Sequence, residues 1–308
     1  IKKSYGLGRI GDDCAVLPKD SKTDLLITAD MLVEDVDFRI GWTTPEFLGH
    51  KALAVSLSDI AAMGGQPTFA MLSLGVPERL WKSDFLDRFY AGWHGLARDF
   101  GVELVGGDVS RVPEKFVIDS IVLGEVERGR AIPRSGAKPG DKIYVTGSLG
   151  GAAGGLKLLE SGTRPDQDLR QTVREMIERQ LCPAPRLGVS SQLPASAMID
   201  LSDGLSSDLG HICEASGAGA VIFAEQIPID VRLDSIFSSF DEKLHLALDG
   251  GEDFELLFTA DPKKNLPAEF ADLTCIGEIT ANVGRMELIR DGVASEMKPK
   301  GFQHFRSN

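Results

Sequence analysis

The chain has 308 residues, of which 43% are hydrophobic, with 33 Lys and Arg against 46 Asp and Glu. The resulting net charge of −13 argues against a protein that binds duplex nucleic acid, because such proteins present a basic face. At this length a single hydrophobic core usually splits in two, so we expect two domains.

The cysteines and the hydropathy pattern limit the setting in which the protein works. The four cysteines are widely spaced and form no C-x-x-C pair, which signals neither a zinc site nor a disulfide framework. No apolar stretch approaches the ~20 residues that span a bilayer, and no signal peptide is apparent. We therefore expect a cytoplasmic protein that does not act on a membrane.

The first part of the chain mixes strand and helix patterns. Leu25–Thr28 reads as a buried strand that delivers Asp30 at its tip. Thr44 and Pro45 predict a helix start, and apolar spacing continues the helix to about Met63. Further expected elements are a strand at Thr68–Val76, a helix at Lys82–Phe100, a strand at Val102–Val105 ending at Gly106-Gly107-Asp108, and a strand at Phe116–Val126.

Turn-forming residues concentrate at Arg134–Asp141 and predict a domain boundary, with an N-terminal domain of residues 1–137 and a C-terminal domain of residues 138–308. Beyond it we expect strands at Lys142–Thr146, Ala197–Leu201, Ala220–Phe223 and Phe254–Thr259, and helices that end near Leu159 and cover Asp203–Ala215. Mixed strands and helices in both halves indicate an α+β fold rather than regular βαβ winding.

Six acidic clusters are set in glycine or at the edge of an apolar run. They are Gly11-Asp12-Asp13, Asp30, Asp59, Gly106-Gly107-Asp108, Asp200-Leu201-Ser202-Asp203-Gly204 and Gly250-Gly251-Glu252-Asp253. One Gly-Asp-Asp alone would be read as a turn. Carboxylates that arrive from many segments without matching His or Cys favour hard cations held against a phosphate. Together the clusters predict a magnesium-dependent phosphoryl-transfer enzyme.

Individual positions keep a structural alternative. Asp59 lies in a mostly apolar helix, on the same face as Ser56, and there a carboxylate faces solvent or needs a partner or a metal; we favour the metal. Between Asp200 and the next helix, Ser202 or Asp203 is expected to be an N-cap, which is compatible with binding phosphate and its cation. Phe302 either packs as a terminal plug or stacks on a planar ligand.

The motifs, in order, resemble those of the thiamine-monophosphate kinase family. They are Gly11-Asp12-Asp13-Cys14-Ala15, Thr28-Ala29-Asp30, Leu57-Ser58-Asp59-Ile60-Ala61-Ala62-Met63-Gly64, Gly106-Gly107-Asp108, Arg134-Ser135-Gly136, Asp200-Leu201-Ser202-Asp203-Gly204-Leu205 and Gly250-Gly251-Glu252-Asp253-Phe254. This family is one of an ATP-binding superfamily with aminoimidazole-ribotide synthetase. The resemblance implies an N-terminal α+β sheet domain that dimerises through its sheet and a C-terminal α/β sandwich domain.

The resemblance also implies roles for individual residues. Several magnesium ions would be bound by Asp13, Thr28, Asp30, Asp59, Asp108, Asp200 and Asp203. ATP would be contacted by Gly107, Asp108, Arg134 and Ser202, and catalysis would rest on Asp59, Asp108 and Arg134. The substrate would meet Asp37, Glu252 and Phe302, although the family usually has His where this chain has Asp37.

The implied activity is phosphorylation of thiamine monophosphate to thiamine diphosphate by a homodimer, with ATP as co-substrate. Two alternatives stay open. One is an ATP-dependent enzyme similar to selenophosphate synthetase, and the other is a catalytically silent metal-binding dimeric scaffold, which the departure at Asp37 would allow. Turnover of ATP separates the scaffold from the enzymes.

Overall fold

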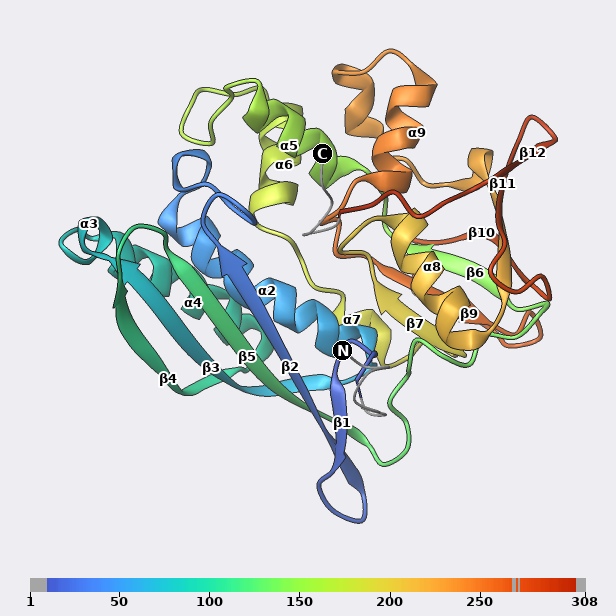
Figure 1. The fold of residues 1–308 in the computed structure, drawn as a ribbon, viewed down its shortest axis with the longest axis horizontal. Coiled ribbons are helices and arrows are strands. Elements are labelled where there is room, and N and C mark those ends of the chain that lie inside the picture. The colour runs from blue at the N-terminus through green and yellow to red at the C-terminus, as the bar shows by residue number, and fades with distance from the viewer. Residues whose placement is uncertain (1–9, 268–269, 271, 303–308) are drawn as a thin grey trace. The chain divides into compact units, whose positions relative to one another are not determined.

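The structure is a computed structural model that describes residues 10–267, 270 and 272–302. The chain divides into two compact units, Ile1–Ala131 and Ile132–Asn308, and each contains one sheet (Figure 1). Strands and helices are mixed in both units, which confirms the predicted α+β class. The division falls just before the turn-rich segment at Arg134, and a domain boundary between residues 137 and 138 stays a prediction.

Unit 1 contains a five-stranded sheet in the order β1-β2-β5-β3-β4. Its strands are β1 (Ala15–Pro18), β2 (Thr23–Val33), β3 (Gln66–Pro77), β4 (Glu103–Val112) and β5 (Val117–Glu127). Neighbours are antiparallel except β3 and β4, which run parallel. The expectation that Asp30 ends a strand is wrong, because β2 continues to Val33 and pairs with β5 from Thr23↔Glu127 to Val33↔Val117.

Strand β4 also runs further than expected. Gly106-Gly107-Asp108 lies inside β4, where we had expected the strand to end. A Cβ atom at Gly107 would lie 1.9 Å from the carbonyl oxygen of Leu72 on β3. The glycine thus permits close approach of two paired strands instead of breaking one of them.

The helices of unit 1 are α2 (Pro45–Ala62), α3 (Glu78–Trp81) and α4 (Phe85–Phe100), with a 3₁₀ turn at Ile40–Trp42. Helix α2 starts as predicted, because the Thr44 hydroxyl accepts a hydrogen bond of 3.2 Å from the backbone N–H of Phe47. Helices α2 and α4 touch through glycine. A Cβ atom at Gly92 on α4 would lie 1.9 Å from the carbonyl oxygen of Glu46 on α2.

Unit 2 contains a seven-stranded sheet in the order β12-β11-β8-β10-β6-β9-β7. Its strands are β6 (Lys142–Thr146), β7 (Ala197–Asp200), β8 (Gly219–Phe223), β9 (Leu256–Ala260), β10 (Leu273–Thr280), β11 (Met286–Arg290) and β12 (Val293–Glu296). The pairings are antiparallel except that between β11 and β8. Strands β6, β7, β8 and β9 lie close to their predicted positions, whereas β10 to β12 were not predicted.

The helices of unit 2 are α5 (Gly151–Glu160), α6 (Gln171–Leu181), α7 (Leu187–Ser190), α8 (Leu205–Ser216) and α9 (Phe240–Asp249), with 3₁₀ turns η2 (Ala224–Gln226) and η3 (Val231–Ser235). Apolar residues of α8 and α9 share the main core with β6 to β10. A smaller core joins α5, α6, η3 and α9 through Ala153, Met176, Leu233 and Leu246. Among the described residues, no helix has the length and apolar character needed to cross a bilayer.

Candidate active site

In unit 1, β2 and α2 bring four of the expected side chains together in two pairs. The hydroxyl of Thr28 donates to the carboxylate of Asp59. The hydroxyl of Ser56 donates to Asp30 Oδ2 at 2.7 Å. Residues two apart on a strand and three apart on a helix share a face, so the two spacings match. The shared face predicted for Ser56 and Asp59 is therefore observed.

Asp30 is a half-buried carboxylate among other negative charges. Burial raises its pKa, the hydrogen bond from Ser56 opposes that shift, and repulsion by Asp119 and Asp13 adds to it. Asp13, in the segment that precedes β1, thus lies within electrostatic reach of Asp30. The donors gathered here are carboxylate and hydroxyl oxygens, which are the ligands that Mg²⁺ prefers, so the residues present fit the expected metal.

Asp108 and Gly107 lie in a different part of unit 1. Asp108 is exposed on β4, where it accepts a hydrogen bond of 3.3 Å from the Ser110 hydroxyl and pairs in register with Ser73 of β3. Asp119 of β5 also pairs with Ser73, so a carboxylate that the sequence analysis missed lies in the same row across the sheet. The signal that could have found it is a charged residue inside the apolar run of β5.

Asp37 has a partner within its own loop. Its carboxylate accepts a hydrogen bond of 2.8 Å from the backbone N–H of Val33, and its own N–H donates to the Val33 carbonyl at 3.0 Å. The side chain thereby closes the turn that follows β2. A role at the substrate stays a prediction for this residue.

In unit 2, the segment between β7 and α8 carries three expected residues. Asp200 is the last residue of β7, one residue before the predicted strand end at Leu201, and Ser202 and Asp203 follow it. The expectation that Ser202 or Asp203 caps α8 is wrong, since the N-cap is Gly204, with a φ of 113°. A glycine there adopts a backbone conformation that is strained for other residues.

The N-cap Gly204 has no side chain that could accept a hydrogen bond, and Asp208 in the first turn of α8 provides the acceptor instead. Its Oδ2 atom accepts from the backbone N–H of Asp203 at 3.2 Å and of Gly204 at 3.0 Å. Burial raises the pKa of Asp208 well above its usual value, and the charges of Asp200 and Asp203 raise it further. The three carboxylates therefore lie close together at the helix start.

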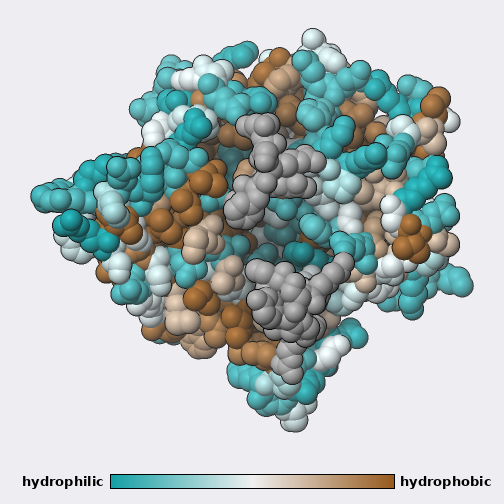
Figure 2. Space-filling model, viewed as in Figure 1, coloured by the Kyte–Doolittle hydropathy of each residue, from teal (hydrophilic) through white to brown (hydrophobic). Residues whose placement is uncertain are grey.

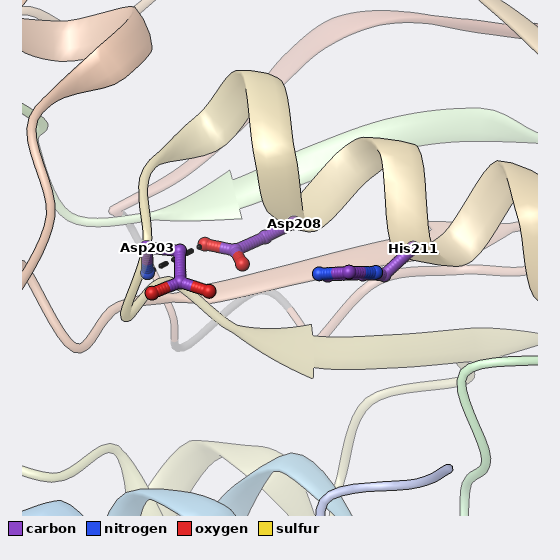
Figure 3. Close-up of side chains that lie close together, drawn as sticks. All are labelled: Asp203, Asp208 and His211. Atoms are coloured by element: carbon purple, nitrogen blue, oxygen red, sulfur yellow. Dashed lines mark hydrogen bonds between the residues drawn. The ribbon is translucent and has the colours of Figure 1, made fainter. Parts of the chain in front are cut away.

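Figure 3 shows Asp208 beside Asp203, with His211 further along α8. One ligand atom from each of these residues lies within 4.8 Å of the others. Asp208 is buried, whereas His211 is exposed. No sequence motif marks Asp208. Its role at the helix start is to accept hydrogen bonds from backbone N–H groups four and five residues earlier in the chain.

Glu252 is held against this same segment. Its backbone N–H donates to the carbonyl oxygen of Ser202 at 2.8 Å, and the N–H of Phe254 donates to the carbonyl of Leu201 at 2.9 Å. A Cβ atom at Gly251 would lie 2.5 Å from the Ser202 carbonyl oxygen, so this glycine is required by close approach of the backbones.

Phe302 is attached to the same segment from the end of the described chain. Its backbone N–H donates to the carbonyl oxygen of Asp203 at 3.1 Å. The preceding Gly301 donates to the Ser207 hydroxyl at 3.0 Å, and a Cβ atom at Gly301 would lie 2.1 Å from the Asp203 oxygen. The Phe302 side chain is 49% exposed, so it is not a buried plug within the described structure.

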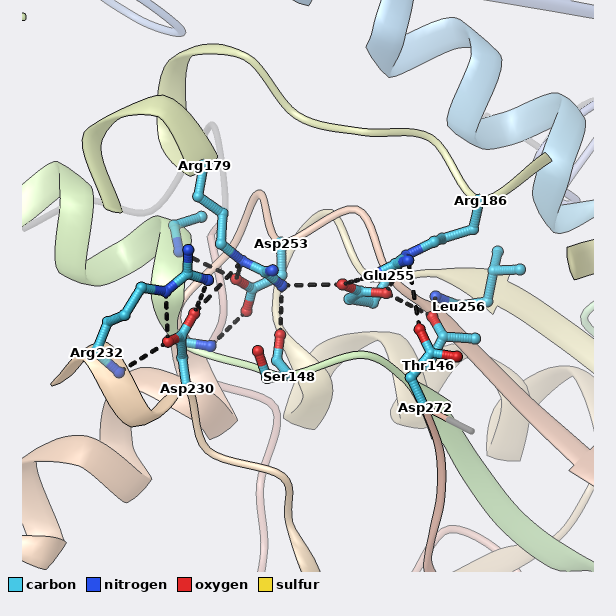
Figure 4. Close-up of polar contacts among 12 residues, drawn as sticks. Thr146, Ser148, Arg179, Arg186, Asp230, Arg232, Asp253, Glu255, Leu256 and Asp272 are labelled. Carbon is cyan, nitrogen blue, oxygen red and sulfur yellow. Dashed lines mark hydrogen bonds and ion pairs between the residues drawn. The ribbon is translucent and has the colours of Figure 1, made fainter. Parts of the chain in front are cut away.

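An ionic network surrounds Asp253 and Glu255, which follow Glu252 in the chain (Figure 4). Three arginines, Arg179, Arg186 and Arg232, alternate with the carboxylates Asp230, Asp253 and Glu255. Burial opposes the charge of Arg179, but Asp253 and Glu255 outweigh it and raise the pKa of the guanidinium. The sequence analysis missed the arginines, which belong to no motif.

Arg134 is half-buried, and its carbonyl oxygen accepts a hydrogen bond of 3.4 Å from the Ser216 hydroxyl. This contact fixes the backbone of Arg134 and gives no direction for its guanidinium. The expected site residues thus lie in two sets. Unit 1 holds Asp13, Thr28, Asp30, Asp37, Asp59, Gly107 and Asp108, and unit 2 holds Arg134, Asp200, Ser202, Asp203, Glu252 and Phe302.

Two family descriptions match the chain. Residues 11–126 match the N-terminal domain of AIR synthase related proteins, and residues 138–286 match the C-terminal domain. Thiamine-monophosphate kinase of Salmonella typhimurium is 40% identical over 96% of this chain and 91% of its own length. The enzyme of the same name from Bacillus subtilis is 36% identical over 96% of this chain and 93% of its own.

Solved structures agree with these relatives. A structure described as AaThiL complexed with AMPPCP and TMP superposes with a TM-score of 0.86 and 35% identity, over 99% of this chain and 94% of that one. The similarity extends over both units, since the match covers 99% of the chain. The chain belongs to the thiamine-monophosphate kinase family.

Proposed function

We propose that the protein transfers the γ-phosphoryl group of ATP to thiamine monophosphate, which yields thiamine diphosphate and ADP. Support comes from the relatives, which are named thiamine-monophosphate kinases and share 36% and 40% of their residues with this chain. The observation that carries the proposal is the solved relative that holds AMPPCP, an ATP analogue, together with TMP, because it matches nearly the whole chain.

The residue roles proposed for unit 2 fit the geometry described above. Ser202 contacts ATP, Asp200 and Asp203 bind magnesium, and Glu252 and Phe302 contact the thiamine end. The backbone bonds from Glu252 to Ser202 and from Phe302 to Asp203 would place both substrate residues beside the nucleotide segment. Arg134 is proposed to contact the ATP phosphates.

In unit 1, we propose that Asp13, Thr28, Asp30, Asp59 and Asp108 bind magnesium, that Gly107 and Asp108 contact ATP, and that Asp37 lies near the substrate phosphate. Ser56 holds Asp30, and Thr28 holds Asp59, so two of these carboxylates have a fixed direction before any ligand arrives. Carboxylates with a fixed direction are favourable metal ligands because they need not reorganise during the reaction.

The chemistry requires little beyond positioning. The acceptor is a phosphate oxygen that is already largely ionised near neutral pH, so no general base is needed. The difficulty is to bring two anions together. Bound magnesium supplies positive charge between the phosphates, while the residues of the chain orient ATP and the acceptor and hold them in line. The catalytic residues are therefore Asp59 and Asp108, which would bind magnesium, and Arg134, which would contact the ATP phosphates.

We also propose that the protein is a homodimer that pairs through the sheet of unit 1. Large apolar side chains are exposed there on β2, β3 and β4, namely Met31, Phe69, Met71, Val105 and Val109. Figure 2 shows apolar surface over the strands of this unit. Exposed apolar patches of this kind often mark protein interfaces. Sedimentation of the wild-type protein and of a Met71→Lys variant tests this arrangement, since the variant should shift toward monomer.

The proposed compartment is the cytoplasm. The four cysteines, all within the described part of the chain, are thiols outside disulfide bonds, and Cys14 and Cys213 are buried. Burial raises the pKa of the Cys213 thiol to about 11, which leaves it largely protonated and unreactive. Free thiols suit a reducing compartment.

The activity is tested by incubating the purified protein with ATP and Mg²⁺, with and without thiamine monophosphate, and identifying products by chromatography. Thiamine diphosphate and ADP should form only when both substrates are present. ATP turnover that does not depend on thiamine monophosphate would favour another member of the superfamily, such as an enzyme that acts on selenide. An absence of any turnover would favour the silent scaffold.

A further inference from the structure

The backbone around Glu252 adopts a strained conformation. Glu252 has a φ of 66° and Phe254 a φ of 48°, and both are non-glycine residues in the left-handed region. Such conformations are unfavourable for residues other than glycine and persist only where surrounding contacts hold them. The contacts that hold this segment therefore indicate which residues define its geometry.

Helix α6 contributes two of the side chains that contact the segment from Glu252 to Glu255. The amide of Gln180 donates to Glu252 Oε2. The neighbouring Arg179 lies 3.4 Å from Asp253 and 3.0 Å from Glu255, measured between guanidinium nitrogen and carboxylate oxygen. Adjacent residues of one helix thus contact three of the four residues Glu252 to Glu255.

Asp253 anchors the same segment to helix α5. Its carboxylate accepts from the backbone N–H of Gly150 at 2.6 Å and of Ala152 at 3.1 Å, at the start of that helix. A negative charge is favourable at a helix N-terminus, where backbone N–H groups are unpaired. Asp253 is thus held by backbone N–H groups at the start of α5 and by Arg179, whereas the carboxylate of Glu252 is contacted by Gln180.

Gln180 is itself held firmly. Only 5% of its surface is exposed. A Cβ atom at Gly155 on α5 would lie 2.1 Å from the carbonyl oxygen of Met176 and 3.1 Å from the Cβ atom of Gln180, so α5 and α6 are in close contact here. The buried side-chain amide of Gln180 therefore has little freedom to turn its N–H group away from Glu252.

We propose that Gln180 is a positioning residue that fixes the carboxylate of Glu252 for the thiamine end of the substrate. This role rests on the proposed function. A free Glu side chain samples several rotamers, and ordering it on binding costs affinity. Gln180 orders Glu252 before the substrate arrives, and the thiazolium ring of thiamine carries a positive charge that a fixed carboxylate attracts.

The test compares two Gln→Met changes on the same helix. Gln180→Met keeps length and removes the amide donor. Gln171→Met is the matched control, because the Gln171 amide also donates to a glutamate, Glu175, at 2.8 Å but on the exposed surface. We expect Q180M to raise the KM for thiamine monophosphate about tenfold and to leave the KM for ATP within about twofold. Q171M should match the wild type.

A double-mutant cycle separates positioning from general damage. Glu252→Gln removes the charge that Gln180 orients, so Q180M should have no further effect on the KM for thiamine monophosphate in that background. Equal changes in both KM values, additive effects in the cycle, or an unchanged KM in Q180M would each overturn the positioning role. If Q180M lowers the thermal midpoint, Gln180→Asn, which retains an amide on a shorter side chain, replaces it in the cycle.

A failure of the positioning role of Gln180 can be distinguished from a failure of the proposed kinase activity. Calorimetric titration of the wild-type protein with thiamine monophosphate, beside the turnover assay, reports on the function without any variant. A wild-type protein that neither binds nor phosphorylates thiamine monophosphate overturns the function and this role together. A wild-type protein that does both, with Q180M unchanged, overturns the role of Gln180 alone.

Discussion

The backbone N–H of Phe302 donates to the carbonyl oxygen of Asp203 at 3.1 Å, across 99 positions of sequence. The bond involves only backbone atoms, so it positions residue 302 whatever its side chain. Phe302 is 49% exposed. A proposed substrate residue and a proposed metal ligand are thus parts of one assembly in unit 2.

Phe302→Ala should raise the KM for thiamine monophosphate about tenfold and change the KM for ATP far less. Alanine retains the N–H bond to Asp203 and removes only the ring that would stack on thiamine. Phe240→Ala is the control, because Phe240 is a similarly exposed phenylalanine of the same unit, at 40%. Steady-state kinetics at varied concentrations of each substrate measure both constants. An equal change in the two KM values would contradict stacking on thiamine.

Asp59→Asn should lower kcat at least about 100-fold, because a group that holds charge at the phosphates would be lost. The Asn side-chain oxygen can still accept from the Thr28 hydroxyl, so the fold should be retained, as checked by the thermal midpoint. Asp99→Asn, at an exposed position of α4, serves as the control and should have the wild-type kcat. A kcat within twofold of the wild type for D59N would sink the metal assignment.

Asp37→His should lower the KM for thiamine monophosphate, because it restores the residue usual in the family and removes a negative charge near a substrate phosphate. It should also lower the free energy of unfolding by about 1 kcal/mol, since the Val33 N–H loses its carboxylate acceptor. Asp37→Asn can keep that acceptor and should retain stability. An unchanged KM in D37H would mean that residue 37 does not contact substrate.

Gly92→Ala should destabilise unit 1 by about 1–3 kcal/mol, because its Cβ atom would lie 1.9 Å from the backbone oxygen of Glu46. Gly95→Ala lies one turn further on α4, and nothing lies within 4 Å of its Cβ atom. That change should stabilise the helix by about 0.5–1 kcal/mol. Calorimetry of both variants measures the difference. Thermal midpoints that shift equally would contradict the close contact between α2 and α4.

Local signals explain which elements could be predicted. The helix at Pro45–Ala62 was predicted nearly to the residue, because Thr44 caps it and Gly64 follows it. The predicted strand at Val102–Val105 is shorter than β4, because glycine usually interrupts strands. Here Gly107 instead allows β3 and β4 to approach closely. That requirement comes from a neighbouring strand and leaves no trace in the local pattern.

The same distinction holds for the candidate site. The acidic clusters and the family resemblance predict Asp59, Asp203 and Glu252 as site residues, and these roles stay predictions. The partners of the Glu252–Asp253 segment carry no local signal, because Gln180 lies 72 positions from Glu252 and Arg179 lies 74 positions from Asp253. Only the packing of α6 against the loop brings these side chains into contact, and a single sequence does not record that packing.

The central claim, direct phosphoryl transfer, is tested by following the label from [γ-³²P]ATP in a reaction with thiamine monophosphate and Mg²⁺. The label should appear in thiamine diphosphate, in an amount equal to the ADP formed. Label found only in inorganic phosphate, with no labelled thiamine diphosphate, would contradict it.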